Sequence, residues 1–174
     1  MENLNLYLSQ LERCNKGIRF DSAQEIKDVS GKKPGGWAEG IVAEAIGDRY
    51  HKHGKKCHVR RANGRKFILD GYIEDLDCYV ESKNFSFFSS GTASEKLYSV
   101  FVKFEEYDKQ TLLVFCGEHE RLSDDASKVI WDAFHNPHSC NSKSVVALVN
   151  SVRHKIRDIV KLSELHGWII KNRF

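Results

Sequence analysis

Apolar and polar residues follow two different periods along this chain, and the change of period predicts the order of its elements. Apolar residues at near-helical spacing predict a short amphipathic helix over residues 1–15. The apolar arc of WAEGIVAEAIGDRY predicts a second helix from about Trp37 to Tyr50. The segment RKFILDGYIEDLDCYVESKN, residues 65–84, instead follows the period of two that strands show. We expect this segment to form a β-hairpin that turns between Asp75 and Leu76.

The second half of the chain predicts one buried strand among helices. Gln110–Gly117 is a continuous apolar run, as in a strand that is covered on both faces. A helix is expected over Asp124–Phe134 and a loop over His135–Cys140. Helical spacing of apolar residues from about Lys143 to His166 predicts one long amphipathic helix, and GWIIKNRF is expected to be a last strand. Together these elements predict an α/β fold, with a mixed central β-sheet flanked by helices.

Length and composition agree with an ordinary globular protein. The chain has 174 residues, and we expect residues 1–174 to form one domain. Its five cysteines are scattered without CxxC spacing, which favours a reducing compartment over a disulfide framework. Neither a signal-peptide pattern nor an apolar run of about 18 residues is present in the sequence, so we expect no membrane association. The expected location is the cytoplasm, for a bacterial or virus-encoded protein.

Charged residues converge in the predicted hairpin. Residues that lie directly opposite each other share one face of a sheet, with Cβ atoms roughly 4.5–5.5 Å apart. Lys83 lies two residues beyond Glu81 and therefore projects from the same face. Two carboxylates and an ammonium group are thus expected in one small area, which predicts a metal site with a positioned base or electrophile. The opposed pairs are Ile73 with Cys78, Tyr72 with Tyr79, Gly71 with Val80, and Asp70 with Glu81.

Two other acids and one plain alternative bear on this cluster. Glu39 lies at the edge of the apolar arc of the second helix and is directed towards the core. Asp77 shares the face of Glu81 and is the rival to Asp70, but its place in or next to the turn favours a solvated turn residue. The alternative for the whole group is a surface pairing across two strands, which sheets often show.

These residues resemble the motif of the PD-(D/E)XK nuclease superfamily, which has the restriction-endonuclease-like fold. The resemblance covers roughly residues 37–117, and SGTASEKL after the hairpin also looks like segments of type II restriction enzymes. Leu69 stands where the motif has its proline, a common variation in that superfamily. The resemblance is carried by Glu39 in WAEG, Asp70 in ILDGY, and Glu81 and Lys83 in YVESKN.

The resemblance implies a Mg²⁺-dependent endonuclease, with Mn²⁺ as an alternative ion, that cuts double-stranded DNA and leaves 5′-phosphate and 3′-hydroxyl ends. Asp70 and Glu81 would anchor the ion, with the Ser82 carbonyl and Glu39 as further ligands. Lys83 would orient the attacking water and help to neutralise the phosphate. The favoured subclass is a type II restriction endonuclease, acting as a homodimer because its targets are palindromic. A structure- or repair-specific nuclease and a non-catalytic DNA-binding module are the alternatives.

Candidate DNA contacts lie in a basic stretch before the hairpin and in two polar loops. The net charge of +3 is too small to indicate nucleic acid by itself, and a basic cluster is often only a solvated face. Phosphate neutralisation beside the acidic site would nevertheless be useful. The candidates are Lys55, Lys56, Arg60, Arg61, Asn84, Ser89, Ser90, Thr92, His135, Asn136 and His138. Cysteines and histidines between Cys116 and Cys140 also leave a zinc site open.

Overall fold

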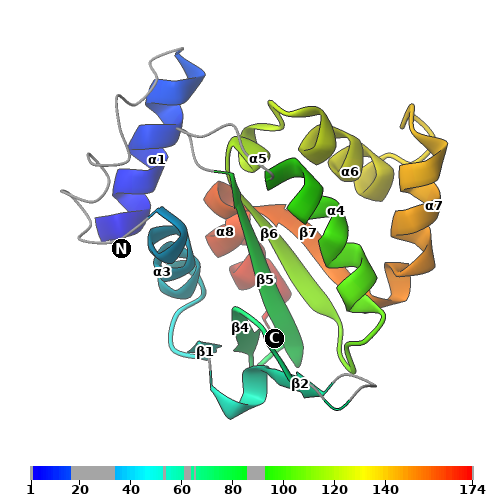
Figure 1. Cartoon of the computed structure of the whole chain (residues 1–174). Coiled ribbons are helices and arrows are strands. Elements are labelled where there is room, and N and C mark those ends of the chain that lie inside the picture. Colours follow the sequence, from blue (N-terminus) through cyan, green and yellow to red (C-terminus); the bar gives the residue numbers. More distant parts are fainter. Residues whose placement is uncertain are drawn as a thin grey trace.

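The computed structural model describes residues 2–16, 34–52, 54–60, 64, 66–85 and 93–173. Helices cover both faces of a five-stranded sheet (Figure 1). The helices are α1 (Glu2–Asn15), α3 (Pro34–Ile46), α4 (Ala93–Phe104), α5 (Glu118–Arg121), α6 (Asp125–His135), α7 (Lys143–Ser151) and α8 (Leu162–Asn172), with 3₁₀ turns η1 (Lys55–Cys57) and η2 (Arg153–Lys155). The strands are β1 (Tyr50–Lys52), β2 (His58–Arg60), β3 (Lys66–Ile68), β4 (Gly71–Ile73), β5 (Cys78–Phe85), β6 (Thr111–Gly117) and β7 (Ile156–Lys161).

The five-stranded sheet is mixed, as the sequence predicted. Its strand order is β1-β4-β5-β6-β7, and β2 and β3 form a separate two-stranded sheet. The pairs β1–β4 and β4–β5 are antiparallel, whereas β5–β6 and β6–β7 are parallel. Parallel neighbours need long crossover connections, and helices supply them: α4 joins β5 to β6, while α5, α6 and α7 lie between β6 and β7.

Two apolar cores lie on opposite faces of this sheet. Helices α1, α3 and α8 cover one face, and α4, α6 and α7 cover the other (Figure 1). Side chains of a strand alternate between the faces, so Val80 lies in the first core and Tyr79 in the second. Every residue of β6 is buried, which confirms the predicted central strand. Among the described residues, no helix has both the length and the apolar character that a membrane crossing requires.

The predicted long helix and terminal strand are wrong. Instead, α7 ends at Ser151, β7 follows as a strand parallel to β6, and the last described element is the helix α8. The β-branched residues Ile156, Ile159 and Val160 suit a strand as well as a helix, and pairing with the edge of β6 decides between the two. In α8, Leu162, Leu165 and Ile169 form the buried stripe of an amphipathic helix.

The second helix is also shorter than predicted at its end. Helix α3 stops at Ile46, and Gly47 follows it with a φ of 83°, the left-handed conformation that commonly ends a helix. Tyr50, which was expected in the helix, is instead the first residue of β1 and lies opposite Ile73 of β4. This shift brings Tyr50 into the sheet beside the hairpin that carries the predicted site.

Candidate active site

The predicted hairpin has the predicted register. Gly71 lies opposite Val80, Tyr72 opposite Tyr79 and Ile73 opposite Cys78, which confirms the turn around Leu76. The first arm, however, is divided, because β3 pairs with β2 in the smaller sheet and only β4 pairs with β5. Asp70 lies in the bend between β3 and β4, one residue before the paired segment.

The bend directs the Asp70 carboxylate to the neighbouring strand. Its Oδ2 accepts a hydrogen bond from the backbone N–H of Ser82 at 2.7 Å and another from the Ser82 hydroxyl at 2.8 Å. Ser82 was expected to contribute its carbonyl to a metal; here its amide and hydroxyl orient Asp70. Both donors belong to Ser82 of β5, whose side chain alternates with those of its neighbours Glu81 and Lys83, so the Asp70 carboxylate is bound to Ser82 and not to either of them.

Glu81 is a buried acid, with only 6% of its surface exposed. The ammonium group of Lys83 lies 2.5 Å from its Oε1. Burial raises the pKa of the Glu81 carboxyl; the charge of Lys83 opposes this rise and the negative charge of Asp70 adds to it. Glu81 is thus paired with Lys83, and the negative charge of Asp70 acts on it as a repulsion between two carboxylates.

The Glu81–Lys83 pair lies on the face of the sheet that α4 covers. Glu81 and Lys83 stand beside Leu113 and Phe115 of β6, both of which belong to the second core. Lys103 of α4 adds a further positive charge that lowers the pKa of Glu81, an interaction that the sequence did not reveal. Only the packing of α4 on this face, which is a tertiary contact, brings Lys103 towards β5.

Glu39 approaches from α3, which packs on the opposite face of the sheet. Its carboxylate lies 3.1 Å from the ammonium group of Lys52, and its side chain is 30% exposed. Lys52 stands opposite Gly71, directly after Asp70 in the chain. The structure thus brings Glu39 to the edge of the site. There it forms an ion pair with Lys52 of β1, which the sequence did not single out.

Tyr50 of β1 contacts the bend at Asp70. Its hydroxyl donates a hydrogen bond to the backbone carbonyl of Asp70 at 3.1 Å. Burial raises the pKa of the Tyr50 phenol, and the charges of Asp70 and Glu39 add to the rise. No local sequence pattern identifies Tyr50, because its position depends on the pairing of β1 with β4.

Asp77, the rival to Asp70, is a turn residue. It has a φ of 45°, accepts a hydrogen bond from the Tyr72 hydroxyl at 2.6 Å, and pairs with Lys109 at 2.7 Å. These contacts lie at the end of the hairpin, away from Ser82, and the carboxylate is 66% exposed. The interpretation of Asp77 as a solvated turn acid is therefore confirmed.

The predicted DNA contacts are only partly described. Lys55 is exposed, whereas Lys56 pairs with Glu74 at 2.6 Å. His135 lies 2.9 Å from the carbonyl of Ile159 in β7, two strands away from the strand of Glu81, and Asn136 and His138 follow it in an exposed loop. Arg61, Ser89, Ser90 and Thr92 lie outside the described residues, and only the backbone of Arg60 and Asn84 is described.

The cysteines and histidines after β6 have other partners. Cys116 is fully buried in the first core, and His119 lies 3.1 Å from the Asp124 carboxylate. Within the part of the chain that the structure describes, no group of three or more His, Cys, Asp or Glu side chains is arranged so that it could hold a metal ion. This statement covers the open zinc site as well as the acids of the hairpin.

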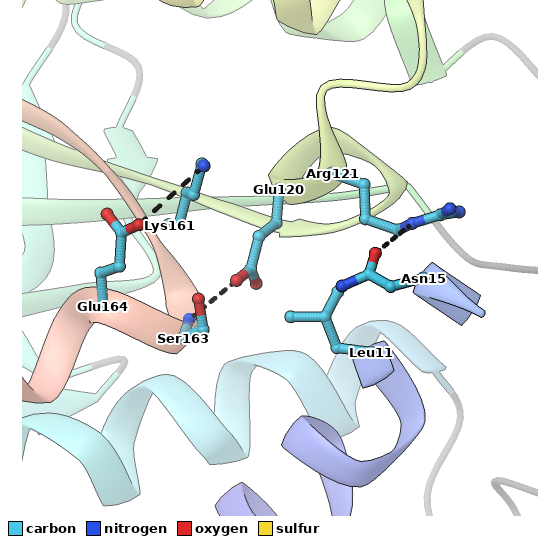
Figure 2. A pocket seen from close by; sticks show the side chains of 7 residues that line it. All are labelled: Leu11, Asn15, Glu120, Arg121, Lys161, Ser163 and Glu164. Atoms are coloured by element: carbon cyan, nitrogen blue, oxygen red, sulfur yellow. Dashed lines mark hydrogen bonds and ion pairs between the residues drawn. The ribbon is translucent and has the colours of Figure 1, made fainter. Parts of the chain in front are cut away.

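A second buried glutamate lies at the carboxyl ends of β6 and β7. Glu120 of α5 accepts a hydrogen bond from the Tyr7 hydroxyl at 2.5 Å and another from the backbone N–H of Ser163 at 3.1 Å. Its carboxylate borders a pocket of about 260 Å³ (Figure 2). The lining residues are Leu11, Asn15, Glu120, Arg121, Lys161, Ser163 and Glu164. Sequence reasoning missed this carboxylate, whose partners come from both ends of the chain.

Comparison with family models, with curated proteins and with solved structures finds no match for this chain.

Proposed function

We propose that this chain is a divalent-metal-dependent endonuclease that hydrolyses phosphodiester bonds of double-stranded DNA. The observation that supports the proposal most is the buried Glu81 carboxylate, which has Lys83 on its own strand and Asp70 on the adjoining segment. Two acids that repel each other beside a lysine provide the charge pattern that a cation and a phosphate would both satisfy.

The two carboxylates are donors of the kind that a hard divalent ion such as Mg²⁺ or Mn²⁺ prefers, but among the described residues they are not grouped with a third acidic, histidine or cysteine ligand. Among the described residues, neither Oδ1 of Asp70 nor Oε2 of Glu81 receives a hydrogen bond. These two oxygens would bind the ion, with Glu39 and the Ser82 carbonyl as further candidates. Carboxylate and carbonyl oxygens are the ligands that such ions prefer. When bound, the ion would stabilise charge on the phosphate and make a bound water more acidic.

Each residue of the cluster then has a definite task. Ser82 holds the Asp70 carboxylate in one orientation through its amide and hydroxyl. Glu81 positions the Lys83 ammonium group through their ion pair. Lys83 donates a hydrogen bond to the attacking water and offsets the negative charge that develops on the phosphate oxygens. Water forms the new P–O bond as the 3′-oxygen leaves, which gives 5′-phosphate and 3′-hydroxyl ends.

The finer assignment is a type II restriction endonuclease with the restriction-endonuclease-like fold. The succession of α3, the β4–β5 hairpin, α4 and the buried strand β6 supports it, since the resemblance implies this order. Recognition of a palindrome by a homodimer belongs to the same proposal, because two copies related by a twofold axis can address the two DNA strands equally.

The test is incubation of the protein with plasmid DNA and Mg²⁺, beside the variants Glu81→Ala and Lys83→Ala. Lys109→Ala is a matched control, because Lys109 also pairs with an acid of this hairpin, but at its exposed turn. We expect discrete fragments from the wild type and from Lys109→Ala, and none from the two site variants. Cleavage of only branched or flapped DNA would favour a repair nuclease. Binding without cleavage in any metal would favour a non-catalytic module.

A further inference from the structure

The bend at Asp70 is held by contacts from two other strands. It lies between β3 of the small sheet and β4 of the large one, where the direction of the chain changes. Ser82 of β5 donates two hydrogen bonds to the carboxylate, and Tyr50 of β1 donates one to the backbone carbonyl. Both the side chain and the main chain of Asp70 are therefore fixed, each from a different side of β4.

The Tyr50 ring lies against the backbone immediately after Asp70. A Cβ atom added to Gly71 would lie 2.1 Å from Cε2 of Tyr50, and 2.2 Å from both its Cζ and its hydroxyl oxygen. Gly71 is not among the glycines with a positive φ, so its backbone conformation does not require glycine. Glycine is needed here for the close approach of the ring.

The position of Tyr50 is itself well determined. It stands opposite Ile73 in the β1–β4 pair, and its backbone N–H donates to the carbonyl of Gly47 at 3.0 Å. The half-buried ring packs against the first core, and a tyrosine hydroxyl in such a position usually has a hydrogen-bond partner inside the protein. The carbonyl of Asp70 is that partner, and the hydrogen bond fixes the position of the Asp70 backbone relative to Tyr50.

We propose that Tyr50 is a positioning residue for the divalent ion, acting through Asp70. Its hydroxyl and ring fix the bend while Ser82 fixes the carboxylate, so that the metal-binding oxygen of Asp70 is held in place before the ion arrives. This inference rests on the proposed function, because it requires Asp70 to be a metal ligand. Outer partners of this kind commonly alter metal affinity by about 10- to 100-fold when they are removed.

The experiment compares Tyr50→Phe with Tyr72→Phe. Tyr72 is a matched control because its hydroxyl also donates to an aspartate, the turn residue Asp77, at 2.6 Å. Binding of Mn²⁺ is measured by calorimetry, and plasmid cleavage is measured as a function of Mg²⁺ concentration. We expect Tyr50→Phe to weaken Mn²⁺ binding and to raise the Mg²⁺ concentration for half-maximal cleavage by about 10-fold. Tyr72→Phe should leave both values unchanged, at a similar unfolding temperature.

A second variant guards against loss of folding. Ser82→Ala removes the hydroxyl bond to Asp70 and keeps the backbone bond, so it should weaken Mn²⁺ binding in the same direction. Equal effects of Tyr50→Phe and Tyr72→Phe on metal binding would overturn the inference, and so would a wild type that binds no divalent ion. A wild type that binds Mn²⁺ and leaves every DNA intact would instead refute the proposed function. The Mn²⁺ titrations would then still test whether Tyr50 affects the affinity for the ion.

Discussion

Glu81 and Glu120 are both buried, and burial raises the pKa of both, yet their surroundings differ in kind. The oxygens of Glu120 accept hydrogen bonds from the Tyr7 hydroxyl and the Ser163 amide, which are neutral donors on two separate helices. Glu81 has as its partner Lys83, two residues away on the same strand, and it faces the like charge of Asp70.

Under the proposed function, this contrast is the difference between a structural carboxylate and one that would bind a ligand. Glu120 connects α1 and α8 to the end of β6, and its bonds join parts of the chain that are far apart in sequence. Within the part of the chain that the structure describes, the hydrogen bond of Glu81 is to Lys83 on its own strand, and only the charge of Lys103 reaches it from another element. A buried charge that is close to another acid is costly unless a ligand compensates it, and such groups occur often at functional sites. The difference can be tested by substitutions in the two clusters.

The largest expected effect is the loss of DNA cleavage in the variant Glu81→Gln. We expect the rate to fall by on the order of 100-fold or more, because the variant loses a carboxylate that would hold the ion and position Lys83. The urea midpoint should stay near that of the wild type, since the hydrogen bond of Glu81 joins it only to Lys83 on the same strand. Initial rates of plasmid cleavage and urea titrations measure the two quantities. Glu120→Gln is the control and should cleave at nearly the wild-type rate; the opposite ranking would contradict the contrast.

Tyr7→Phe should have the largest effect on stability among these changes. The Tyr7 hydroxyl donates to Glu120 and accepts from the backbone N–H of Gly117 at 2.7 Å, and both partners are buried. Loss of the hydroxyl removes the partner of the Gly117 amide and of Oε2 of Glu120, which lowers the free energy of unfolding by roughly 1–3 kcal/mol. Urea unfolding measures this loss. Tyr98→Phe is a suitable control, because among the described residues the Tyr98 hydroxyl has no hydrogen-bond partner; an equal loss there would disprove the reasoning.

A smaller effect is expected in the pH dependence of stability. The pKa of Glu120 is raised above its ordinary value of 4.5 chiefly by burial, with opposing contributions from Ser163, Tyr7 and Lys161. The folded protein therefore takes up a proton at higher pH than the unfolded chain does. The resulting stabilisation is complete below pH 4.5 and is lost as the pH rises through the folded pKa.

The variant Glu120→Gln lacks this contribution. The free energy of unfolding of the wild type should therefore rise relative to that of Glu120→Gln as the pH is lowered from 7 to about 4.5. Urea titrations of both proteins at several pH values measure the difference. Parallel pH profiles would show that Glu120 does not titrate differently in the folded and unfolded states.

The smallest effect is expected for Asp77→Asn. Asn tolerates the positive φ at this position and can still accept the Tyr72 hydrogen bond, so stability should change by no more than about 0.5 kcal/mol. Cleavage should remain at the wild-type level, because Asp70 and not Asp77 adjoins Glu81. A plasmid assay beside Asp70→Asn distinguishes the two aspartates. Loss of cleavage in Asp77→Asn alone would reverse their assignment.

Sequence patterns predicted those parts of the fold that depend on local order. Alternation around the turn at Leu76 was sufficient for the hairpin register, and the run at Gln110–Gly117 was sufficient for the buried strand. The segment from Lys143 to His166 failed because its apolar spacing suits both a helix and a short helix followed by a strand. Only the edge of β6, which is a distant partner, selects the strand.

The candidate site shows the same division. The proximity of Glu81 and Lys83 follows from the period of two within one strand, whereas Asp70 lies in a bend outside the paired residues. Tyr50 and Lys103 could not be found in this way, because β1 pairing and α4 packing bring them to the hairpin. The role of Ser82 was also not predictable, since the bend at Asp70 arises where β3 and β4 enter different sheets.

The bond between Tyr7 and Glu120 joins residues that are 113 positions apart. When the chain is synthesised from its N-terminus, α1 leaves the ribosome long before α5 and α8 exist. Its buried tyrosine then has neither the carboxylate nor the Gly117 amide to which it finally binds. Helix α1 can pack early against Trp37 of α3, but it acquires these two buried hydrogen bonds only after the chain as far as α5 has been made.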